Sequence, residues 1–466
     1  MPKAVQDNDL LYNVLSPLVQ FATRCHYNRF VVRGTENLPT DGAYIIAPCH
    51  QQALMEPLAV LCFAPKPPVF LARADIFAKP TLRAILTFLK IMPVYRIRDG
   101  QDKLGRNKEI FDRSRDVLLD GYPLCLMAEG RHNNRHHLLN MGKGMFRIAG
   151  ETQLKLGDHP LFIVPTGIDF DEYERPYSNM VVNIGKPIPV KPFMEEYIVD
   201  EPVALNRMRD ALFEALLPLM HDIRNGEHYD EIMTLCNTLN REMRHREGLR
   251  NNAWNRFIMR QKISKQMDAL AAEEGSPKFD TLIKNAGVLR SLCDGMKINE
   301  KLLSEHWGLP ATMLSVLGFA AIVAAAVMLP PLRWLLLFCL LCNPIPLLPT
   351  HLITKKKIAD PQFRSSVNYG IRLGLSIIYA IAIFVVTISG GLDWLTGHIS
   401  FGIQLPSLVW GIIAVALLHL EARLAGPVIN LFRDMISNCH YWLLRLFKRA
   451  SMRKVDETYS ALAASL

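Results

Sequence analysis

Residues 43–57 have the sequence Ala-Tyr-Ile-Ile-Ala-Pro-Cys-His-Gln-Gln-Ala-Leu-Met-Glu-Pro, which is the most informative segment for the fold. Its first five residues, Ala43 to Ala47, form a short β-rich run, and the segment that follows carries His50 and, six positions later, Glu56. A six-residue offset is ~240° around an ideal helix, so these two side chains would not share a helix face. We therefore expect His50 to lie in a loop between a strand and a helix.

Short β-rich runs and helical segments alternate in the same way over residues 29–190, within a domain that we expect to span residues 29–203. We expect seven strands, which are Phe30 to Val32, Ala43 to Ala47, Val69 to Ala72, Met92 to Tyr95, Leu124 to Met127, Leu161 to Ile168 and Met180 to Ile184. This alternation predicts an α/β domain with its candidate site residues at the ends of strands. Residues 204–306 are helical and heavily charged in composition, with an interruption near Gly275-Ser276-Pro277, and predict a helical appendage.

Residues 1–28 contain an apolar run, Leu10 to Ala22, whose apolar side chains recur at helical spacing. Its 13 residues are too few to cross a bilayer, which takes ~20. The segment is either an interfacial helix on a membrane or a helix docked on the core, and both alternatives stay open. It lacks the basic n-region of a cleaved signal peptide.

The C-terminal third has the composition of a membrane region. Four segments carry almost no ionisable group, namely Ala311 to Leu329, Leu335 to Leu348, Leu373 to Ile388 and Leu405 to Leu420. Three or four membrane helices within residues 307–422 explain this pattern, and we prefer four. The second segment contains prolines and could be a broken or re-entrant helix. The alternative for the whole region is a buried soluble helical bundle.

Basic residues alternate between the connections of these segments. The second connection carries Lys355, Lys356, Lys357 and Arg364, whereas the one around Gly390-Gly391 has no lysine or arginine. Residues 423–466 are again basic, with apolar residues at helical spacing, and predict an amphipathic helix on the cytoplasmic leaflet. With four crossings, the positive-inside rule places both termini and the α/β domain in the cytoplasm.

Charge and cysteine content limit the classes of protein that fit. The chain has 466 residues, 50% of them hydrophobic, and a formal net charge of +9, which favours anionic partners. No segment interleaves aromatic with basic residues as a nucleic-acid binder would, so we expect membrane lipids as partners instead. The nine cysteines are scattered, which indicates reduced thiols rather than a disulfide framework. The oligomeric state stays open.

His50 and Glu56 together have the chemistry of a general base. The carboxylate would accept a hydrogen bond from one ring nitrogen, fix the tautomer and stabilise the imidazolium that forms as the other nitrogen takes a proton from an alcohol. Glu129-Gly130-Arg131 adds a cation suited to an anionic substrate. The combination suggests acyl transfer to a phosphate-bearing alcohol. Cys49 could instead be acylated, but neighbouring residues at a strand end point apart, so we expect direct transfer.

Four segments occur in an order that resembles a known family. They are Ala47 to Pro57, Phe70 to Arg96, Cys125 to Arg131 with Lys143 to Arg147 downstream, and Ile163 to Ile168. The set resembles the glycerolipid acyltransferases related to lysophosphatidate acyltransferase, whose blocks are His-x4-Asp, a central arginine, a Phe-Pro-Glu-Gly-Thr/Ser-type segment and a later proline-containing strand. The resemblance covers roughly residues 30–189 and implies an acyltransferase-type mixed sheet flanked by helices.

The chain departs from the family pattern at two places. Met55 occupies the position of the expected aspartate, and the carboxylate follows one place later as a glutamate, whose longer stem can compensate. Met127-Ala128 stands where Phe-Pro is usual, and no hydroxyl residue follows Glu129-Gly130.

The resemblance implies a membrane-bound enzyme that transfers a fatty acyl group from acyl-CoA or acyl carrier protein to 1-acyl-glycerol-3-phosphate or glycerol 3-phosphate in phospholipid synthesis. His50 and Glu56 would be catalytic. The acceptor phosphate would be bound by Arg96 and Arg131, with Arg73, Arg98 and Lys143 as weaker candidates. Glu129 would bind the glycerol hydroxyl or brace Arg131, and Gly130 belongs to the same acceptor-binding set. No metal or redox cofactor is implied beyond the thioester co-substrate.

Other functions stay open. The altered spacing could mark a catalytically inactive membrane scaffold that only binds lipid. A transporter would place ionisable groups inside its spans, and the nearly charge-free segments speak against it. His132, His136 and His137 could suggest zinc, and the spacing of His132 and His136 would suit a helix. No third ligand follows at a defined spacing, so we expect no metal.

Overall fold

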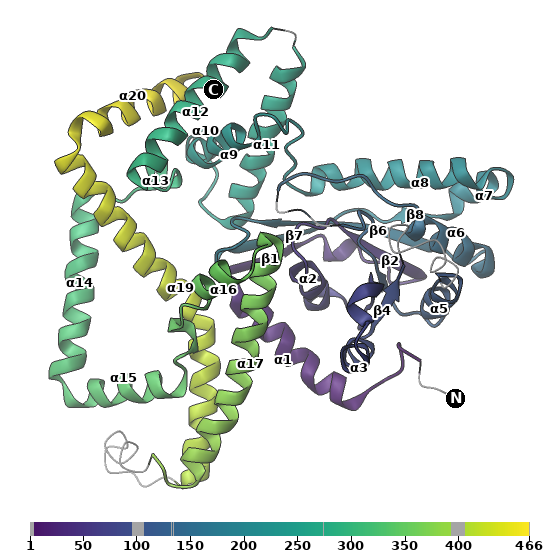
Figure 1. Ribbon diagram of the computed structural model, residues 1–466, viewed down its shortest axis with the longest axis horizontal. Helices are drawn as coiled ribbons and strands as arrows, with labels where there is room; N and C mark the ends of the chain where they lie inside the picture. Colours follow the sequence, from purple (N-terminus) through teal and green to yellow (C-terminus); the bar gives the residue numbers. More distant parts are fainter. Residues whose placement is uncertain are drawn as a thin grey trace.

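The computed structural model describes residues 4–95, 107–131, 133, 135–273, 275–392 and 406–465. An α/β domain occupies one side of the molecule, a helical appendage lies above it, and long apolar helices extend on the other side (Figure 1). The expected seven strands are all present, with an eighth short strand that the sequence did not indicate.

Among the described residues, the eight strands form one mixed sheet. They are β1 (Arg29–Arg33), β2 (Ala43–Pro48), β3 (Val69–Arg73), β4 (Ile91–Val94), β5 (Leu124–Cys125), β6 (Leu161–Phe170), β7 (Asn179–Ile184) and β8 (Ile188–Pro189). The order is β1-β7-β6-β2-β5-β3-β4, and β8 pairs with β6. All pairs are parallel except β6 with β7 and β6 with β8, which are antiparallel. The mixed α/β sheet expected from the sequence is therefore confirmed.

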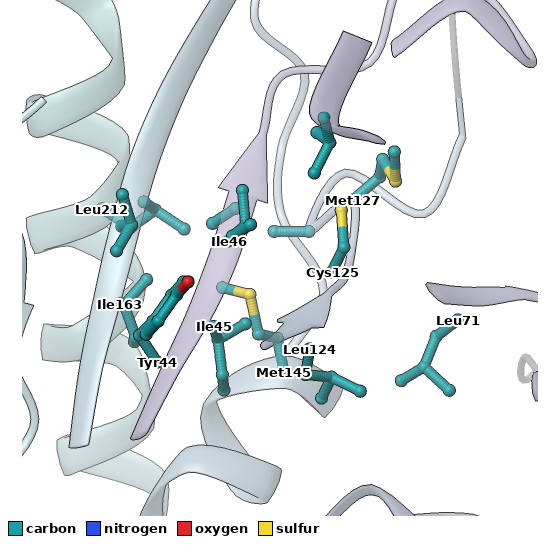
Figure 2. Packing of buried hydrophobic residues seen from close by; sticks show 14 of the residues in the cluster. Tyr44, Ile45, Ile46, Leu71, Leu124, Cys125, Met127, Met145, Ile163 and Leu212 are labelled. Atoms are coloured by element: carbon teal, nitrogen blue, oxygen red, sulfur yellow. The ribbon is translucent and has the colours of Figure 1, made fainter. Parts of the chain in front are cut away.

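Strand β2 lies in the middle of the sheet, where every one of its residues is buried. A strand covered on both faces is typically a continuous run of apolar residues rather than an alternating one, as Ala43 to Ala47 is. Figure 2 shows its side chains packed among residues of β5, β6 and neighbouring helices, with Ile45 and Ile46 fully buried. The loop that carries His50 begins directly after the last residue of this buried strand, Pro48.

Helices cover both faces of the sheet, with α8 on one side and α2 and α3 on the other (Figure 1). The helices of this region are α1 (Leu10–His26), α2 (Met55–Phe63), α3 (Pro80–Phe88), α5 (Asn107–Leu119), α6 (Gly144–Leu156), α7 (Met194–Val199) and α8 (Glu201–Leu216), with short 3-10 turns η1 (Thr35–Asn37), η2 (Ala74–Phe77), η4 (Lys191–Phe193) and η5 (Leu217–Leu219). Asp9 caps α1 and Asp200 caps α8, each accepting a backbone N–H of the first turn. Helix α1 packs against α2, α17 and α19.

The boundary between the α/β domain and the appendage differs from the expected one at residue 204. The buried residues of α8, from Ala204 to Leu216, belong to the same core as the sheet. Charged residues on the outer face of α8 gave it the composition of the appendage, but its inner face covers the sheet. The appendage begins after Met220 and contains α9 (Tyr229–Thr238), α10 (Asn240–Arg246), α11 (Ala253–Ala272), α12 (Pro277–Met296) and α13 (Lys301–Glu305).

Three helices in the described part of the chain are long and apolar enough to cross a membrane. They are α14 (Leu309–Met328), α17 (Pro361–Ile388) and α19 (Ser407–Phe447). The expected second crossing, Leu335 to Leu348, instead contains most of α15 (Pro330–Cys342) and the 3-10 turn η6 (Ile345–Leu347), which are short pieces separated by a proline. Helix α16 (Thr350–Lys357) follows this segment. Figure 1 shows α14 and α17 running down from the level of the sheet, with α15 lying across at the lower end. The count of four crossings stays a prediction.

The basic tail is part of a longer structure than the sequence indicated. Helix α19 continues without a break from the apolar segment through residue 447, and α20 (Arg449–Ser465) follows it. Tyr441 and Leu444 of α19 and Val455 of α20 share a buried core with the appendage. One face of this segment therefore packs on protein, while Leu431, Leu443 and other apolar residues of α19 stay exposed.

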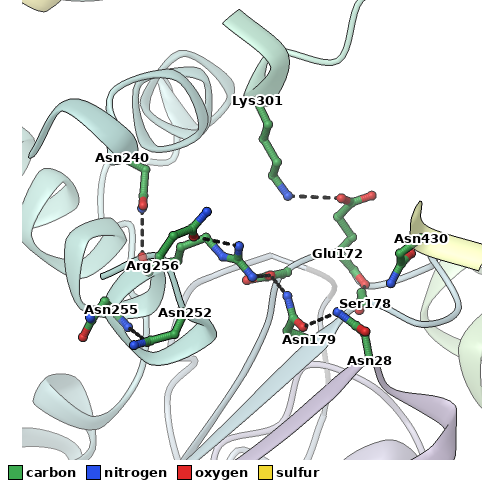
Figure 3. A network of polar contacts seen from close by, with 12 residues as sticks. Asn28, Glu172, Ser178, Asn179, Asn240, Asn252, Asn255, Arg256, Lys301 and Asn430 are labelled. Carbon is green, nitrogen blue, oxygen red and sulfur yellow. Dashed lines mark hydrogen bonds and ion pairs between the residues drawn. The ribbon is translucent and has the colours of Figure 1, made fainter. Parts of the chain in front are cut away.

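A polar network joins the appendage to the edge of the sheet (Figure 3). Lys301 of α13 forms an ion pair with Glu172, at a distance of 3.1 Å between Nζ and Oε1. Asn179 of β7 donates to Asp171 over 2.5 Å, and Asn430 of α19 donates to the carbonyl of Tyr177 over 2.8 Å. The appendage, the sheet and the last long helix are therefore held together by an ion pair and hydrogen bonds as well as by apolar packing.

Candidate active site

His50 lies in the loop between the end of β2 at Pro48 and the start of α2 at Met55, as expected from its spacing to Glu56. The His50 side chain is 14% exposed, and its Nδ1 lies 3.5 Å from Oε2 of Glu56, whose side chain is completely buried. The two residues come together because the chain turns in the loop before the helix begins. The imidazole thus combines access to solvent with a buried acidic partner.

The position of the Glu56 carboxylate is set by the loop in front of it. Its Oε1 accepts hydrogen bonds from the backbone N–H groups of Gln51, at 2.8 Å, and Gln52. Glu56 stands in the first turn of α2, where a negative charge is favoured by the free N–H groups and the helix dipole. With Oε1 held in this way, Oε2 faces the imidazole of His50.

Glu129 follows β5 and supports the same loop from the other side. Its Oε1 accepts the backbone N–H of His50 at 2.7 Å, and its Oε2 accepts the N–H of Leu139 at 2.9 Å. Burial raises the pKa of Glu129 to about 8, against the opposing effect of these two hydrogen bonds. The next residue, Gly130, has a φ of 62°, a left-handed conformation that glycine adopts without strain. Glu129 therefore holds the backbone of the loop that carries His50.

The candidate cations have different surroundings. Arg131 and Lys143 are exposed, and neither has an ion-pair partner within the residues that the structure describes. Arg73 is different, since its Nε donates to Asp75 over 2.8 Å. Arg96, Arg98 and His132 lie outside the described residues. Arg131 and Lys143 are thus the two candidates most available to an anionic ligand.

Cys49 points away from the His50 side chain and into the sheet. Its Sγ donates to the carbonyl of Ile168 over 3.4 Å and accepts from the N–H of the same residue over 3.1 Å. Burial raises the pKa of this thiol well above its ordinary value. Because the thiolate is the nucleophilic form, Cys49 is a poor candidate for an acyl-enzyme intermediate.

The sequence analysis did not identify Tyr173 and Ser366, which are far from the His50 loop in the sequence but hydrogen-bonded to it. The Tyr173 hydroxyl donates to Oε1 of Gln51 over 3.0 Å, and its carbonyl accepts from Nε2 of Gln52 over 2.7 Å. The hydroxyl of Ser366 in α17 accepts the N–H of Leu54 over 3.0 Å. Two consecutive glutamines in the loop, Gln51 and Gln52, indicate hydrogen bonds to another segment but do not identify it. Nothing in the sequence links position 54 with position 366.

The bond to Ser366 places the loop at the upper end of a helix long enough to cross a membrane. Arg364 of the same helix forms an ion pair with Glu174, at 2.9 Å between Nη1 and Oε1. A mainly apolar cavity of about 230 Å³ lies between α1, α17 and α19, and Phe21, Ile377 and Leu418 are among its lining residues. The loop that carries His50 is therefore attached directly to the apolar helical region.

Comparisons with known proteins found one family model and similar solved structures. A protein-family model described as Acyltransferase matches residues 29–169, which include His50, Glu56 and Glu129. No curated protein matches the chain. Among solved structures, the chain is similar to the crystal structure of the 1-acyl-sn-glycerophosphate (LPA) acyltransferase PlsC from Thermotoga maritima, with 18% identity, a TM-score of 0.31, and coverage of 45% of this chain and 83% of that one. The family match therefore covers most of the sheet region of the α/β domain, from residue 29 to residue 169.

Proposed function

We propose that the protein transfers a fatty acyl group from acyl-CoA or acyl carrier protein to 1-acyl-glycerol-3-phosphate or glycerol 3-phosphate at a membrane surface. The observation that carries this proposal is the pair of His50 and Glu56, 3.5 Å apart, with the carboxylate buried and fixed and the imidazole partly exposed. A thioester already has a good leaving group, so the reaction chiefly needs a base for the acceptor hydroxyl.

In the proposed mechanism, Nε2 of His50 takes the hydroxyl proton as the oxygen attacks the thioester carbonyl. The C–O bond forms, the C–S bond breaks, and the proton passes from the imidazolium to the departing thiolate. Glu56 keeps the proton of the other ring nitrogen on Nδ1 and stabilises the imidazolium. General-base assistance of this kind contributes ~10²–10⁴-fold, and the rest comes from holding the two substrates together.

Arg131 and Lys143 are the proposed binding groups for the acceptor phosphate, because guanidinium and ammonium groups match its charge and its oxygens. Both are exposed on the α/β domain, and Arg131 follows Glu129 by two residues. The arrangement of loop and helix supports a substrate with an acyl tail, since the bond from Leu54 to Ser366 joins the catalytic loop to α17. An acyl chain partitions into a bilayer, where a tethered site meets it at high local concentration.

The experiment uses purified full-length protein in lipid nanodiscs. Acyl-CoA and acyl carrier protein are each offered with glycerol 3-phosphate and with its 1-acyl form in competition, and the products are identified by mass spectrometry. His50→Ala should lower kcat by ~10²-fold or more, and Glu56→Gln should lower it as well while keeping an oxygen for the N–H groups of Gln51 and Gln52. His159→Ala is the matched control, because His159 is exposed on the same domain away from this loop.

The same experiment separates the proposal from an inactive lipid-binding scaffold. A scaffold would give no product with any donor and acceptor, although it would still bind the lipid in the nanodisc. A His50→Ala variant as active as the wild type would exclude the mechanism even if product forms.

A further inference from the structure

A cluster of three buried residues lies behind the catalytic loop and has no role in the proposed acyl transfer. His136 stands in the segment after Glu129, Asp169 near the end of β6, and His221 in the connection between η5 and the appendage. Their side chains are 2%, 1% and 0% exposed, respectively. Each offers a ligand atom of the kind that holds a metal ion, and the three atoms lie within 4.8 Å of one another.

One polar atom on each of these side chains is buried and makes no hydrogen bond within the described part of the chain. The atoms are Nδ1 of His136, Oδ1 of Asp169 and Nδ1 of His221. The first two face each other across 3.1 Å without the geometry of a hydrogen bond. Buried polar groups are normally satisfied, and each exception calls for an explanation such as an ion. Three such atoms in one cluster are best explained by a common partner.

The second polar atoms of His221 and Asp169 are hydrogen-bonded to neighbouring side chains, as the non-coordinating atoms of metal ligands usually are. Nε2 of His221 is hydrogen-bonded to Oγ of Ser264 at 2.7 Å, and Oδ2 of Asp169 accepts from Arg260 at 2.5 Å. In metal sites, the second ring nitrogen of a ligand histidine and the second oxygen of a ligand carboxylate are typically bonded in this way.

We propose that His136, Asp169 and His221 bind one divalent transition-metal ion, with Zn²⁺ as the best match to two imidazoles and a carboxylate. The role of the ion would be structural, because it would join three segments of the chain, with a water molecule as its fourth ligand.

The metal site would join three segments that are distant in the sequence, and it would contact the loop that carries His50 through Tyr173. The rings of His136 and Tyr173 lie 4.9 Å apart, and Tyr173 is bonded to both Gln51 and Gln52. The ion would therefore fix the segment after Glu129, the end of β6 and the start of the appendage around the loop that carries His50. The sequence analysis considered His132, His136 and His137 together, whereas the structure brings His136 to partners that are far away in the chain.

The test measures bound metal and does not depend on activity. Full-length protein with a tag free of histidine is produced in zinc-supplemented medium, purified in detergent, passed over a chelating resin, and analysed by mass spectrometry of its metals. We expect about one Zn²⁺ per chain. His136→Gln and His221→Gln should each hold at least about tenfold less, because loss of a ligand should cost no less than loss of its outer partner. The control His137→Gln, at the neighbouring histidine that pairs with Asp222, should keep the metal.

Two further measurements keep the proposal testable if the histidine variants fail to fold. Ser264→Ala changes only an outer partner and should weaken Zn²⁺ binding by about 10–100-fold. Replacement of the ion in wild-type protein by Co²⁺ should give the visible absorption of a four-coordinate site, which His137→Gln should retain. Wild-type protein without bound metal after zinc supplementation, or equal metal in the His136→Gln and wild-type proteins, would overturn the proposal. Because activity is not measured, failure of the proposed acyl transfer would leave this result unaffected.

Discussion

Oε1 of Glu129 accepts the backbone N–H of His50 across 2.7 Å, so the Glu-Gly-Arg segment and the histidine segment form one structure. The glutamate acts on the position of the imidazole through the backbone and does not reach toward the exposed side of the site. This arrangement differs from the expected roles of Glu129, which were to bind a glycerol hydroxyl or to brace Arg131. The Glu129 carboxyl, whose pKa is raised, is thus hydrogen-bonded directly to the loop that carries His50.

The first prediction concerns the pH dependence of stability. Burial raises the pKa of Glu129 from 4.5 to about 8. Below the lower value the carboxyl is protonated in both states. Between the two values the unfolded chain ionises while the folded chain keeps its proton, so the contribution of Glu129 to the free energy of unfolding falls as pH rises, by at most about 1.4 kcal/mol per pH unit. Glu129→Gln cannot ionise and should lack this fall.

Chemical denaturation in one detergent, between about pH 5 and pH 8, measures this difference. Glu36→Gln changes an exposed glutamate and should keep the wild-type slope. Parallel curves for Glu129→Gln and the wild type would show that Glu129 is ionised in the folded state throughout.

The second prediction concerns Cys49. The Sγ atom is bonded to the backbone of Ile168 and faces the sheet, so Cys49→Ala should keep kcat within about threefold of the wild type while losing some stability from a lost hydrogen bond and a small cavity. Intact-protein mass spectrometry after rapid mixing with acyl-CoA should detect no acyl group on Cys49. An inactive but folded Cys49→Ala protein, or an acylated cysteine, would favour a two-step transfer instead.

Local patterns predicted most of the fold. Strand β2 could be read from the sequence because Ala43 to Ala47 is a short apolar run between polar segments, which only a central strand of a sheet buries on both faces. The loop position of His50 followed from helix geometry alone. The family resemblance then joined Glu56 to His50, and the structure places them 3.5 Å apart.

The parts that could not be predicted depend on contacts between distant positions. Leu54 and Ser366 are bonded across 312 positions, and no local pattern carries that information. Helix α8 was placed in the appendage because its exposed charges dominate its composition, although its inner face covers the sheet. The cluster of His136, Asp169 and His221 likewise draws on three separate segments, so its members look like isolated polar residues in the sequence.

The third prediction concerns Gly167 in β6. A Cβ at this position would lie 2.1 Å from the carbonyl oxygen of Leu219, which is backbone and cannot turn away. Gly167→Ala should therefore lower the free energy of unfolding by about 1–3 kcal/mol or more. Gly226→Ala is the matched control, because a Cβ there would meet nothing within 4 Å. Equal denaturation midpoints for the two variants would mean that η5 can move away from the sheet at little cost.

The last prediction concerns the binding of the acceptor phosphate by Arg131. This side chain is exposed and has no ion-pair partner within the described ranges, two residues after the glutamate that holds the catalytic loop. Charge-assisted hydrogen bonds to phosphate contribute about 1.5–3 kcal/mol, and each 1.4 kcal/mol is a factor of ten. Arg131→Ala should therefore raise KM for the phosphate-bearing acceptor by about tenfold or more, with KM for the thioester unchanged.

Arg147→Ala is the control for charge, since Arg147 lies on α6 of the same domain and its Nε pairs with Glu201 at 2.9 Å. Removal of this cation changes the net charge by the same amount, so it should leave both KM values near those of the wild type. If both variants raised KM equally, the effect would come from the overall positive potential of the domain rather than from a bond at Arg131. A selective effect at Arg131, strongest with a phosphate-bearing acceptor and absent with an uncharged monoacylglycerol, would identify the group that it binds.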